Sequence, residues 1–190
     1  MFLTHRPSAD EIERFVDASR ALPLSYEPVG LAHTGGPGFR VDEEIAHVGA
    51  GAAAFSRATV ALTEWAHFAL GWVEIFPTRA PITEGTVVAV VVRHLGFWSL
   101  NGCRVLYRTG DGNTTFGFGY GTLTNHAESG EEIFEVRLEP TSGEVTYRIR
   151  AVSRPRAPLA RLGYPITRRL QARFRRDSAR AVRRAVEAGR

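Results

Sequence analysis

Residues 155–186 have the sequence pattern of one long amphipathic helix. Apolar residues recur there at intervals of three and four, which places them along one side of a helix of about nine turns. These residues are Leu159, Leu162, Ile166, Leu170, Phe174, Val182 and Val186. A helix with a single apolar stripe is not stable alone in water, because most of its stability comes from packing that stripe on another surface. We therefore expect the rest of the chain to supply a broad apolar surface for this helix.

The preceding segment, residues 86–153, has the alternation of side chains that is typical of strands. The expected strands cover residues 87–94, 97–109, 114–123, 132–139 and 144–152. Residues 110–113 are Gly-Asp-Gly-Asn, and an Asp-Gly pair between two strands is a strong hairpin signal. We expect a meander of five or six antiparallel strands that leads directly into the final helix.

The N-terminal part of the chain adds two helices. Ser8 and Glu11 form a capping box, which predicts a first helix over residues 9–22, and residues 53–71 predict a second. The expected extended segments are residues 24–29, a short strand, and residues 40–48, an edge strand or an extended arm. The fold class is therefore α+β, with an antiparallel sheet of about six strands wrapped around the long C-terminal helix and an extra N-terminal helix. A chain of 190 residues fits one domain that covers residues 1–190.

Composition indicates a soluble protein of the cytoplasm. Hydrophobic residues make up 44% of the chain and charged residues 23%, which is ordinary for a globular protein. Cys103 is the only cysteine, so no internal disulfide can form and a reducing compartment fits. Residues 1–10 lack the apolar centre of a signal peptide, and the longest apolar run, residues 87–92, is too short for a transmembrane segment.

Positive charge is concentrated at the C-terminal end, where residues 153–190 hold twelve arginines and only two acidic residues. The expected basic stripe on the helix consists of Arg169, Arg173, Arg176, Arg180 and Arg184. Such a stripe can bind the phosphates of nucleic acid or of anionic lipid. Aromatic residues do not alternate with these arginines as they do in proteins that bind single strands, and the chain has no lysine, so arginine abundance says little about function. A solvated helix face is the favoured interpretation, and we expect no nucleic acid partner.

One expected strand carries three glycines on one face. Gly117, Gly119 and Gly121 alternate with aromatic residues that point to the other face. Glycine weakens a strand, so three on one face indicate that another group approaches the backbone closely. A packed helix is the favoured occupant and a ligand is the alternative.

Polar residues follow in the same part of the chain. Tyr120, Thr122, His126, Glu131 and Glu132 lie within one strand, loop and strand, and a phenol, an imidazole and carboxylates together can perform acid–base chemistry. The alternative, which we favour, is a polar loop whose side chains cap the hairpin.

Other catalytic and cofactor motifs are absent from the sequence. The histidines lack metal-ligand spacing, a Gly-x-Ser-x-Gly elbow does not occur, and the glycines of residues 117–121 are not followed by a helix that could bind a dinucleotide. Cys103 beside Arg104 fits a buried structural thiol better than a reactive one. We expect no metal and no cofactor.

Several short motifs together resemble one known family. They are Trp65, Cys103-Arg104-Val105, Phe118-Gly119-Tyr120-Gly121-Thr122-Leu123, His126, Gly130-Glu131-Glu132, Ser153-Arg154-Pro155 and Leu162-Gly163-Tyr164-Pro165. In this order they resemble uncharacterised protein family 0548, a domain of unknown function found in bacteria and plants. Asn125 departs from the glycine expected before the histidine. The family has no established reaction, so the resemblance supplies no catalytic residues. Its body is similar to the START-like helix-grip superfamily, whose members hold lipids, polyketides or other apolar molecules, and some of which are cyclases or hydrolases.

The sequence thus leads to three hypotheses. The first is a protein that binds an apolar small molecule or lipid between the final helix and the sheet. The candidate ligand-binding residues are Trp65, Trp98, Arg104, Gly119, Tyr120, Thr122, His126 and Glu132. The second is a cyclase, dehydratase or hydrolase on the same scaffold, with His126 or Tyr120 as acid or base. The third is an interaction protein that uses the arginine stripe. Sequence alone leaves open whether the space between helix and sheet is a cavity or a filled core, and which oligomer forms.

Overall fold

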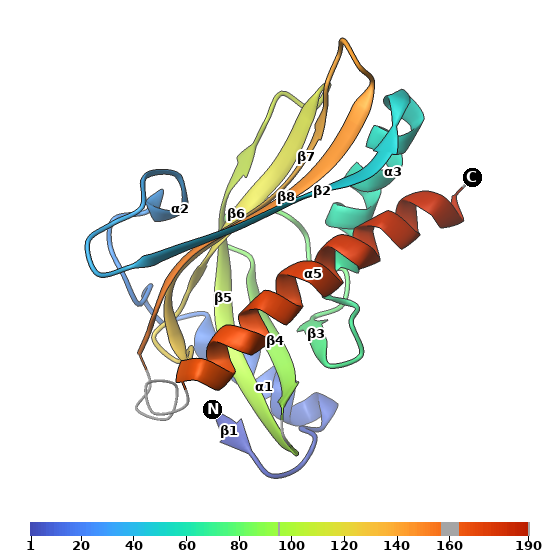
Figure 1. The fold of residues 1–190 in the computed structure, drawn as a ribbon. Helices are drawn as coiled ribbons and strands as arrows, with labels where there is room; N and C mark the ends of the chain where they lie inside the picture. The colour runs from blue at the N-terminus through green and yellow to red at the C-terminus, as the bar shows by residue number, and fades with distance from the viewer. Residues whose placement is uncertain (95, 157–163, 190) are drawn as a thin grey trace.

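A computed structural model describes residues 1–94, 96–156 and 164–189 of the chain. A curled antiparallel sheet forms the body of the molecule; the long helix α5 crosses its concave face and α1 lies behind its outer face (Figure 1). The elements are β1 (Phe2–Leu3), α1 (Ala9–Ser19), α2 (Leu31–Thr34), β2 (Arg40–Ala50), α3 (Gly51–Thr63), the short 3-10 helix η1 (Ala66–Phe68), β3 (Val73–Phe76), β4 (Val87–His94), β5 (Phe97–Thr109), β6 (Thr115–Thr122), β7 (Glu128–Leu138), β8 (Glu144–Pro155) and α5 (Tyr164–Ala188). The α+β class with a sheet around a C-terminal helix is confirmed.

The strands follow the order β2-β8-β7-β6-β5-β4-β3, with β1 paired to one end of β5. Every pair of neighbouring strands is antiparallel, as expected from the sequence. The described residues form eight strands rather than about six, because β1 has only two residues and β3 only four. Strands this short carry too little alternation to be recognised in sequence.

Strand boundaries agree with the sequence pattern to within three residues except at the start of β7, and one expected strand is not formed. The strands expected at residues 87–94 and 97–109 are confirmed at both ends. β7 begins at Glu128 rather than at residue 132, because the polar residues 128–131 pair with β8. Residues 24–29 are not a strand, since within them only an isolated bridge joins Leu24 to Leu123.

Helix α5 is 25 residues long, so it spans about 37 Å. It does not begin at Pro155, which is the last residue of β8, and Leu159 and Leu162 lie outside the described residues. The predicted apolar stripe is confirmed from Leu170 onward, because Val182 and Val186 are fully buried and Leu170 and Phe174 pack against the main core. Ile166, in contrast, is 43% exposed.

The segment expected as one helix over residues 53–71 is broken near its middle. Helix α3 ends at Thr63, Trp65 adopts a left-handed backbone with φ of 58°, and η1 follows. The Trp65 indole donates a hydrogen bond to the carbonyl oxygen of Ala80 at 2.7 Å. This anchored turn directs Trp65, His67 and Phe68 into the main core between α3, α5 and the sheet.

A second core lies on the outer face of the sheet, under α1. Ile12 and Val16 of the helix pack there with Leu100 and Leu123. The predicted capping box of α1 is present, with Ser8 accepting from the backbone of Glu11 and the Glu11 carboxylate accepting from Ser8. The helix itself ends at Ser19, three residues earlier than expected.

The glycine face of β6 lies on this outer side and is occupied by tyrosines rather than by a helix or a ligand. A Cβ added to Gly119 would lie 2.5 Å from Cζ of Tyr107, and the Tyr26 hydroxyl sits against Gly121. Both phenols donate hydrogen bonds to the carboxylate of Glu131, which also accepts from the backbone N–H of Gly30 and Ala32. Glu131 thus fastens the segment of residues 24–39 to the outer face of the sheet.

Candidate ligand-binding cavity

A cavity of about 730 Å³ lies between the concave face of the sheet and α5. Its volume falls within the range of pockets that hold small molecules. Much of its wall is apolar, including Phe68, Trp72, Val90, Val92, Leu170 and Phe174. The space between the sheet and the N-terminal half of α5 is therefore a cavity, while the C-terminal half of α5 packs into the main core.

One wall of the cavity is polar because three of four adjacent strands place polar side chains at matching positions. The register aligns Asp42 of β2 with Ala151 of β8, Ala151 with Glu132 of β7, and Glu132 with Tyr120 of β6. Neighbours in a ladder point to the same face. Small Ala151 leaves room between the two carboxylates of this row.

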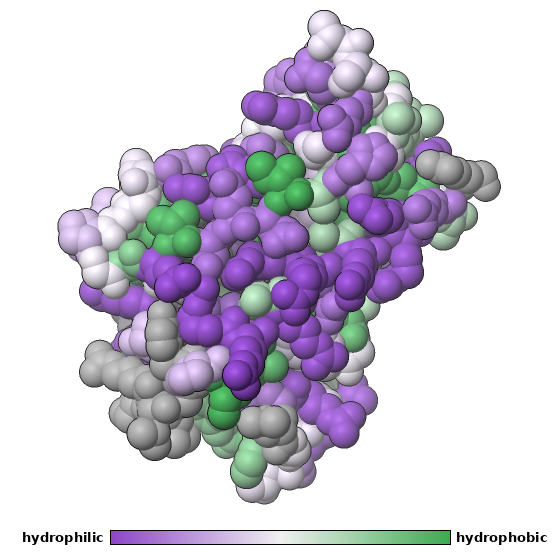
Figure 2. Space-filling view, viewed as in Figure 1, coloured by the Kyte–Doolittle hydropathy of each residue, from purple (hydrophilic) through white to green (hydrophobic). Residues whose placement is uncertain are grey.

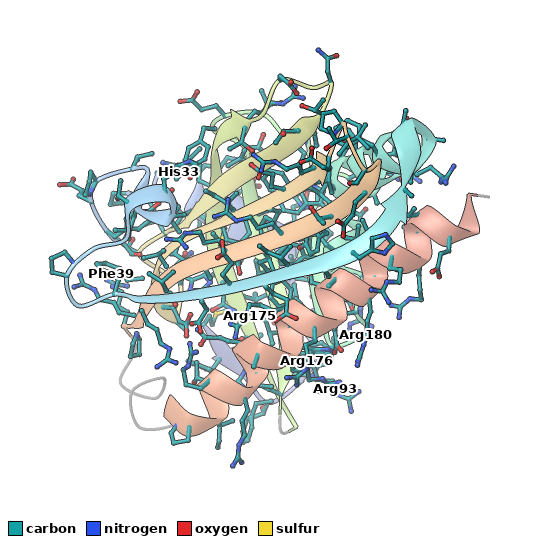
Figure 3. The ribbon with its side chains drawn as sticks, turned by 45° about the horizontal axis from the view of Figure 1, so that its top comes forward. His33, Phe39, Arg93, Arg175, Arg176 and Arg180 are labelled. Carbon is teal, nitrogen blue, oxygen red and sulfur yellow. The ribbon has the colours of Figure 1, made fainter. Side chains whose placement is uncertain are left out.

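Helix α5 covers this row with three polar residues spaced three and four apart, which places them on one side of the helix. Arg168 donates two hydrogen bonds to the carboxylate of Asp42. The Gln171 amide donates to both carboxylate oxygens of Glu128 at 2.7 Å, and Arg175 lies 3.6 Å from Asp42. Figure 3 shows Arg175 in the space between α5 and β2.

Tyr120 and Glu132 form a hydrogen-bonded pair in the polar wall, and burial raises the pKa of both. The Tyr120 hydroxyl donates to Oε2 of Glu132 at 2.7 Å. Burial raises the pKa of Glu132 to about 7; the negative charge of Glu128 adds to the rise, and the Tyr120 hydrogen bond and the charge of Arg175 oppose it. Burial also raises the pKa of the Tyr120 phenol well above its usual value. Glu132 therefore exchanges its proton near neutral pH, while Tyr120 stays a hydrogen-bond donor.

Glu128 and His126 form the next part of the wall. Burial raises the pKa of Glu128, against the hydrogen bonds from Gln171 and Ser153. His126 Nδ1 accepts a hydrogen bond from the backbone N–H of Glu128 at 2.9 Å, and burial lowers the pKa of His126 to about 4. The imidazole is therefore neutral at physiological pH.

Asp42 behaves differently from these two glutamates. Burial alone would raise its pKa, but the hydrogen bonds from Arg168 and the charges of Arg175 and Arg168 outweigh burial and hold the pKa below its usual value. Asp42 is thus a permanent anion that fixes both arginines at the edge of the cavity.

Four of the eight residues predicted to bind a ligand line the cavity: Tyr120, Thr122, His126 and Glu132. The Thr122 hydroxyl is already engaged, since it accepts from the N–H of Gly130, donates to the carbonyl of Gly130 and lies 2.6 Å from the Ser25 hydroxyl. Thr122 thus shapes the wall and joins β6 to β7.

The other four, Trp65, Trp98, Arg104 and Gly119, are not among the residues that line the cavity. Trp65 is in the main core with 3% of its surface exposed, and Gly119 faces Tyr107 on the outer side of the sheet. Trp98 also faces outward, where it packs with the core under α1. Arg104 caps the end of α1 by donating to the carbonyl oxygens of Arg20 and Leu22, both at 2.9 Å. Outward-facing residues alternate with inward ones along β5 and β6, and the sequence alone did not say which set faced the helix.

Comparison with known proteins assigns the chain to a family. The sequence profile of a family described as a domain of unknown function, DUF1990, matches residues 25–181. The chain belongs to this family. A UPF0548 protein of Dictyostelium discoideum is 31% identical over 207 residues, covering 98% of this chain and 96% of the relative. The resemblance to uncharacterised protein family 0548 is confirmed.

Solved structures show that this DUF1990 protein has a START-like helix-grip fold. The protein TTHA0849 from Thermus thermophilus gives a TM-score of 0.57 at 11% sequence identity, covering 79% of this chain and 99% of that protein. The aromatase/cyclase ZhuI from Streptomyces sp. R1128 gives 0.55 at 16% identity, covering 78% of this chain and 94% of that protein. At these identities the likeness establishes the fold alone.

Three polar residues that line the cavity of this DUF1990 chain, Glu128, Gln171 and Arg175, were not predicted from the sequence. Glu128 was assigned to a loop because β7 was expected to begin later. Gln171 and Arg175 were not predicted because they are polar. They nevertheless share one side of the helix with Ser178 and Val182, which are buried, since successive members of this series are four, three and four residues apart. Helical periodicity therefore contained the signal for both residues.

The remaining candidate features of the DUF1990 chain lie outside the cavity. Cys103 is fully buried and burial raises the pKa of its thiol, so the structural interpretation is confirmed. Hydrophilic side chains cover much of the outward surface of α5 (Figure 2). Two arginines of the stripe, Arg173 and Arg180, each pair with Asp177 on the same helix.

Within residues 1–94, 96–156 and 164–189, no three His, Cys, Asp or Glu side chains are grouped so that they could hold a metal ion. Among the same residues, no helix combines the length and the apolar character needed to cross a bilayer.

Proposed function

We propose that this DUF1990 protein binds an apolar small molecule or lipid in the cavity between its sheet and α5. The observation that carries the proposal is a cavity of about 730 Å³ with a largely apolar wall, between the sheet and α5. Native interiors contain few voids larger than a water molecule, and an empty cavity lowers the stability of a fold. A ligand that fills the cavity would offset that loss of stability.

Binding would draw mainly on apolar burial, at about 25 cal/mol for each Å² removed from water, before the costs of ordering the ligand. The apolar body of the ligand lies against Trp72, Val92 and Phe174, and its polar end faces Tyr120 and Glu132. A small number of polar groups at one end of an apolar cavity fixes the orientation of the ligand and provides specificity.

Native mass spectrometry of the freshly purified protein, compared with its denatured mass, tests the proposal. A mass excess that is lost on denaturation, followed by identification of the extracted compound, is the expected result. If the protein carries no compound, titration with 2-(2-naphthyl)ethanol, a neutral apolar probe, is the second measurement. A bare mass together with no binding of this probe would overturn the proposal.

A second candidate function is acid–base catalysis in the same cavity, because Glu132 and Tyr120 form a hydrogen-bonded pair there. The hypothesis that named His126 as the base is less well supported, since its Nδ1 is occupied and burial lowers its pKa to about 4. A carboxyl whose pKa lies near 7 is suited to both accepting and donating a proton. Once a bound compound is identified, Glu132→Gln should abolish its turnover while binding is retained, and equal turnover in the two proteins would exclude this function.

A further inference from the structure

The polar wall of the cavity holds more carboxyl groups than cations. The charged residues among the described lining residues are Glu128, Glu131, Glu132 and Arg175, with His94 and His126 also present. Burial lowers the pKa of both histidines, so neither adds positive charge at neutral pH. Because the Glu131 carboxylate is bonded on the outer face of the sheet, the charge of the wall depends on Glu128, Glu132 and Arg175.

Two of these four groups already have partners inside the protein. The Glu131 carboxylate accepts hydrogen bonds from Tyr26, Tyr107 and two backbone N–H groups on the outer side of the sheet. Arg175 faces Asp42 at 3.6 Å, and only 12% of its side chain is exposed. Arg168, the other cation at this edge, is bonded to Asp42 as well. Asp42 offsets the charge of one of these two arginines, so one positive charge is left to face the two carboxyl groups of Glu128 and Glu132.

Of Glu128 and Glu132, only Glu132 has a carboxylate oxygen that is free of hydrogen bonds from the described residues and can accept one from a ligand. Its Oε2 accepts from Tyr120, and in the part of the chain that the structure describes no donor bonds to Oε1. Glu128, in contrast, has both of its oxygens bonded to the Gln171 amide. Burial raises the pKa of Glu132, the negative charge of Glu128 adds to that rise and the positive charge of Arg175 opposes it, so both charges act on this end of the cavity.

We propose that the ligand of this cavity carries a basic amine, and that the protonated amine pairs with the Glu132 carboxylate while the apolar body of the ligand fills the rest of the space. This inference rests on the proposed function and specifies its ligand class. A cation supplies the positive charge that the wall lacks, and ammonium groups donate hydrogen bonds that a free carboxylate oxygen accepts. Binding of the cation displaces the proton that Glu132 carries part of the time at neutral pH.

An anionic ligand is the alternative that Arg175 raises. Its Nε is buried and bonds to none of the described residues, so it can donate to an acceptor. An anion at that position would lie beside Asp42 and Glu132, and Coulomb repulsion in a partly buried site opposes this arrangement. The amine is therefore the better match.

Three probes with one apolar body and different end groups test the inference on the full chain. They are 2-(2-naphthyl)ethylamine, 2-(2-naphthyl)ethanol and 2-naphthylacetate, titrated by calorimetry at pH 7. The amine should bind about tenfold more tightly than the alcohol, and the carboxylate more weakly than both. Calorimetry in two buffers of different ionisation enthalpy should also show release of a fraction of one proton with the amine and none with the alcohol.

Two variants show whether the preference for the amine depends on Glu132 itself or on negative charge anywhere on the strand. Glu132→Gln should abolish the preference for the amine and the proton release, while alcohol binding persists and shows that the cavity is intact. The matched control is Glu135→Gln, because Glu135 is on the same strand but bonds to Thr109 outside the cavity. This control should keep the preference of the wild type.

Each contrary outcome is distinct. If the alcohol binds as well as the amine, the amine inference fails and the proposed function stands. If the carboxylate binds best, the inference fails and Arg175 is the recognition group. If Glu132→Gln retains the amine preference, the inference fails because Glu132 is not the partner. If none of the probes binds, the inference is overturned, and the proposed function is overturned with it when the native mass is also bare.

Discussion

The phenol ring of Tyr107 lies directly on Gly119, where a Cβ atom would be only 2.5 Å from Cζ of the ring. The ring reaches this position because the register shifts between Val105 and Tyr107 of β5. A bulge adds one residue to one strand and re-aims the side chains that follow. Tyr107 therefore points outward, where its hydroxyl reaches Glu131.

Gly119→Ala should destabilise the protein by about 1–3 kcal/mol, because the added methyl group overlaps the Tyr107 ring. Urea denaturation measures this change. In a Tyr107→Ala background the same substitution should cost much less, since the ring is gone. Equal costs in the two backgrounds would show that the ring contact is not the cause.

Glu131→Ala should loosen residues 24–39 more than the rest of the chain. The substitution removes the acceptor of four hydrogen bonds, and loss of bonds to a buried charged group costs on the order of 3 kcal/mol. Hydrogen exchange should rise in this segment before global unfolding. Glu43→Ala is the control, because the Glu43 pair with Arg148 is partly exposed and contributes about 1 kcal/mol or less. Uniform exchange in both variants would contradict the assignment.

Stability should fall as the pH drops below about 6.5, and His67→Phe should make this fall shallower. His67 is fully buried among aromatic rings, and burial lowers its pKa to about 3. The unfolded chain therefore binds a proton between pH 6.5 and 3 that the folded chain does not. Its contribution is fully present above pH 6.5 and is lost toward pH 3, at roughly 1.4 kcal/mol per pH unit.

The measurement for His67 is a series of urea midpoints from pH 7 to 4. His126 acts in the same direction, so part of the slope should remain in His67→Phe. A variant with the slope of the wild type would show that His67 is not buried as a neutral group.

Glu132→Gln should stabilise the folded protein at pH 8 and have little effect at pH 5. The folded pKa of about 7 lies above the ordinary value of 4.5, so the protonated form is favoured by folding and stability declines as pH rises between these values. Removal of the charge should recover roughly 1–3 kcal/mol at pH 8, the lower figure allowing for solvent that enters the cavity. The midpoint of Glu135→Gln should lack this pH-dependent gain. Gains of equal size at pH 5 and pH 8 would rule out titration as the source.

Val92→Phe should weaken binding of 2-(2-naphthyl)ethanol at least tenfold, because Val92 lines the cavity and the larger ring occupies its volume. Val41→Phe adds the same bulk at an exposed position of β2 and should leave affinity unchanged. Fluorescence titration provides the measurement. Unchanged affinity in the Val92 variant would place the probe outside this cavity.

The sequence predicted the elements with strong local periodicity. Continuous apolar residues in β4 and alternation in β5 located both strands, and the capping box at Ser8 located the start of α1. Sequence failed where a distant partner decides the structure. Residues 128–131 have the composition of a loop, and they form part of β7 because β8 pairs with them.

The candidate site was half predicted for the same reason. Alternation identified Tyr120 and Glu132 as one set and Gly119 as the other, but only the packing of α5 shows which set faces the cavity. The bulge that turns Tyr107 outward leaves no mark in the composition of β5. Trp65 was expected beside a ligand, and a single left-handed residue in the α3–η1 turn instead directs it into the core.

Glu131 and Glu132 are adjacent on β7, and each serves a different side of the sheet. The first holds the outer segment in place and the second meets the cavity. Substitutions of the cavity residue therefore need not disturb the attachment of the outer segment. A combinatorial library confined to positions 132, 171 and 175 would sample that freedom directly, with the outer attachment left intact in every member.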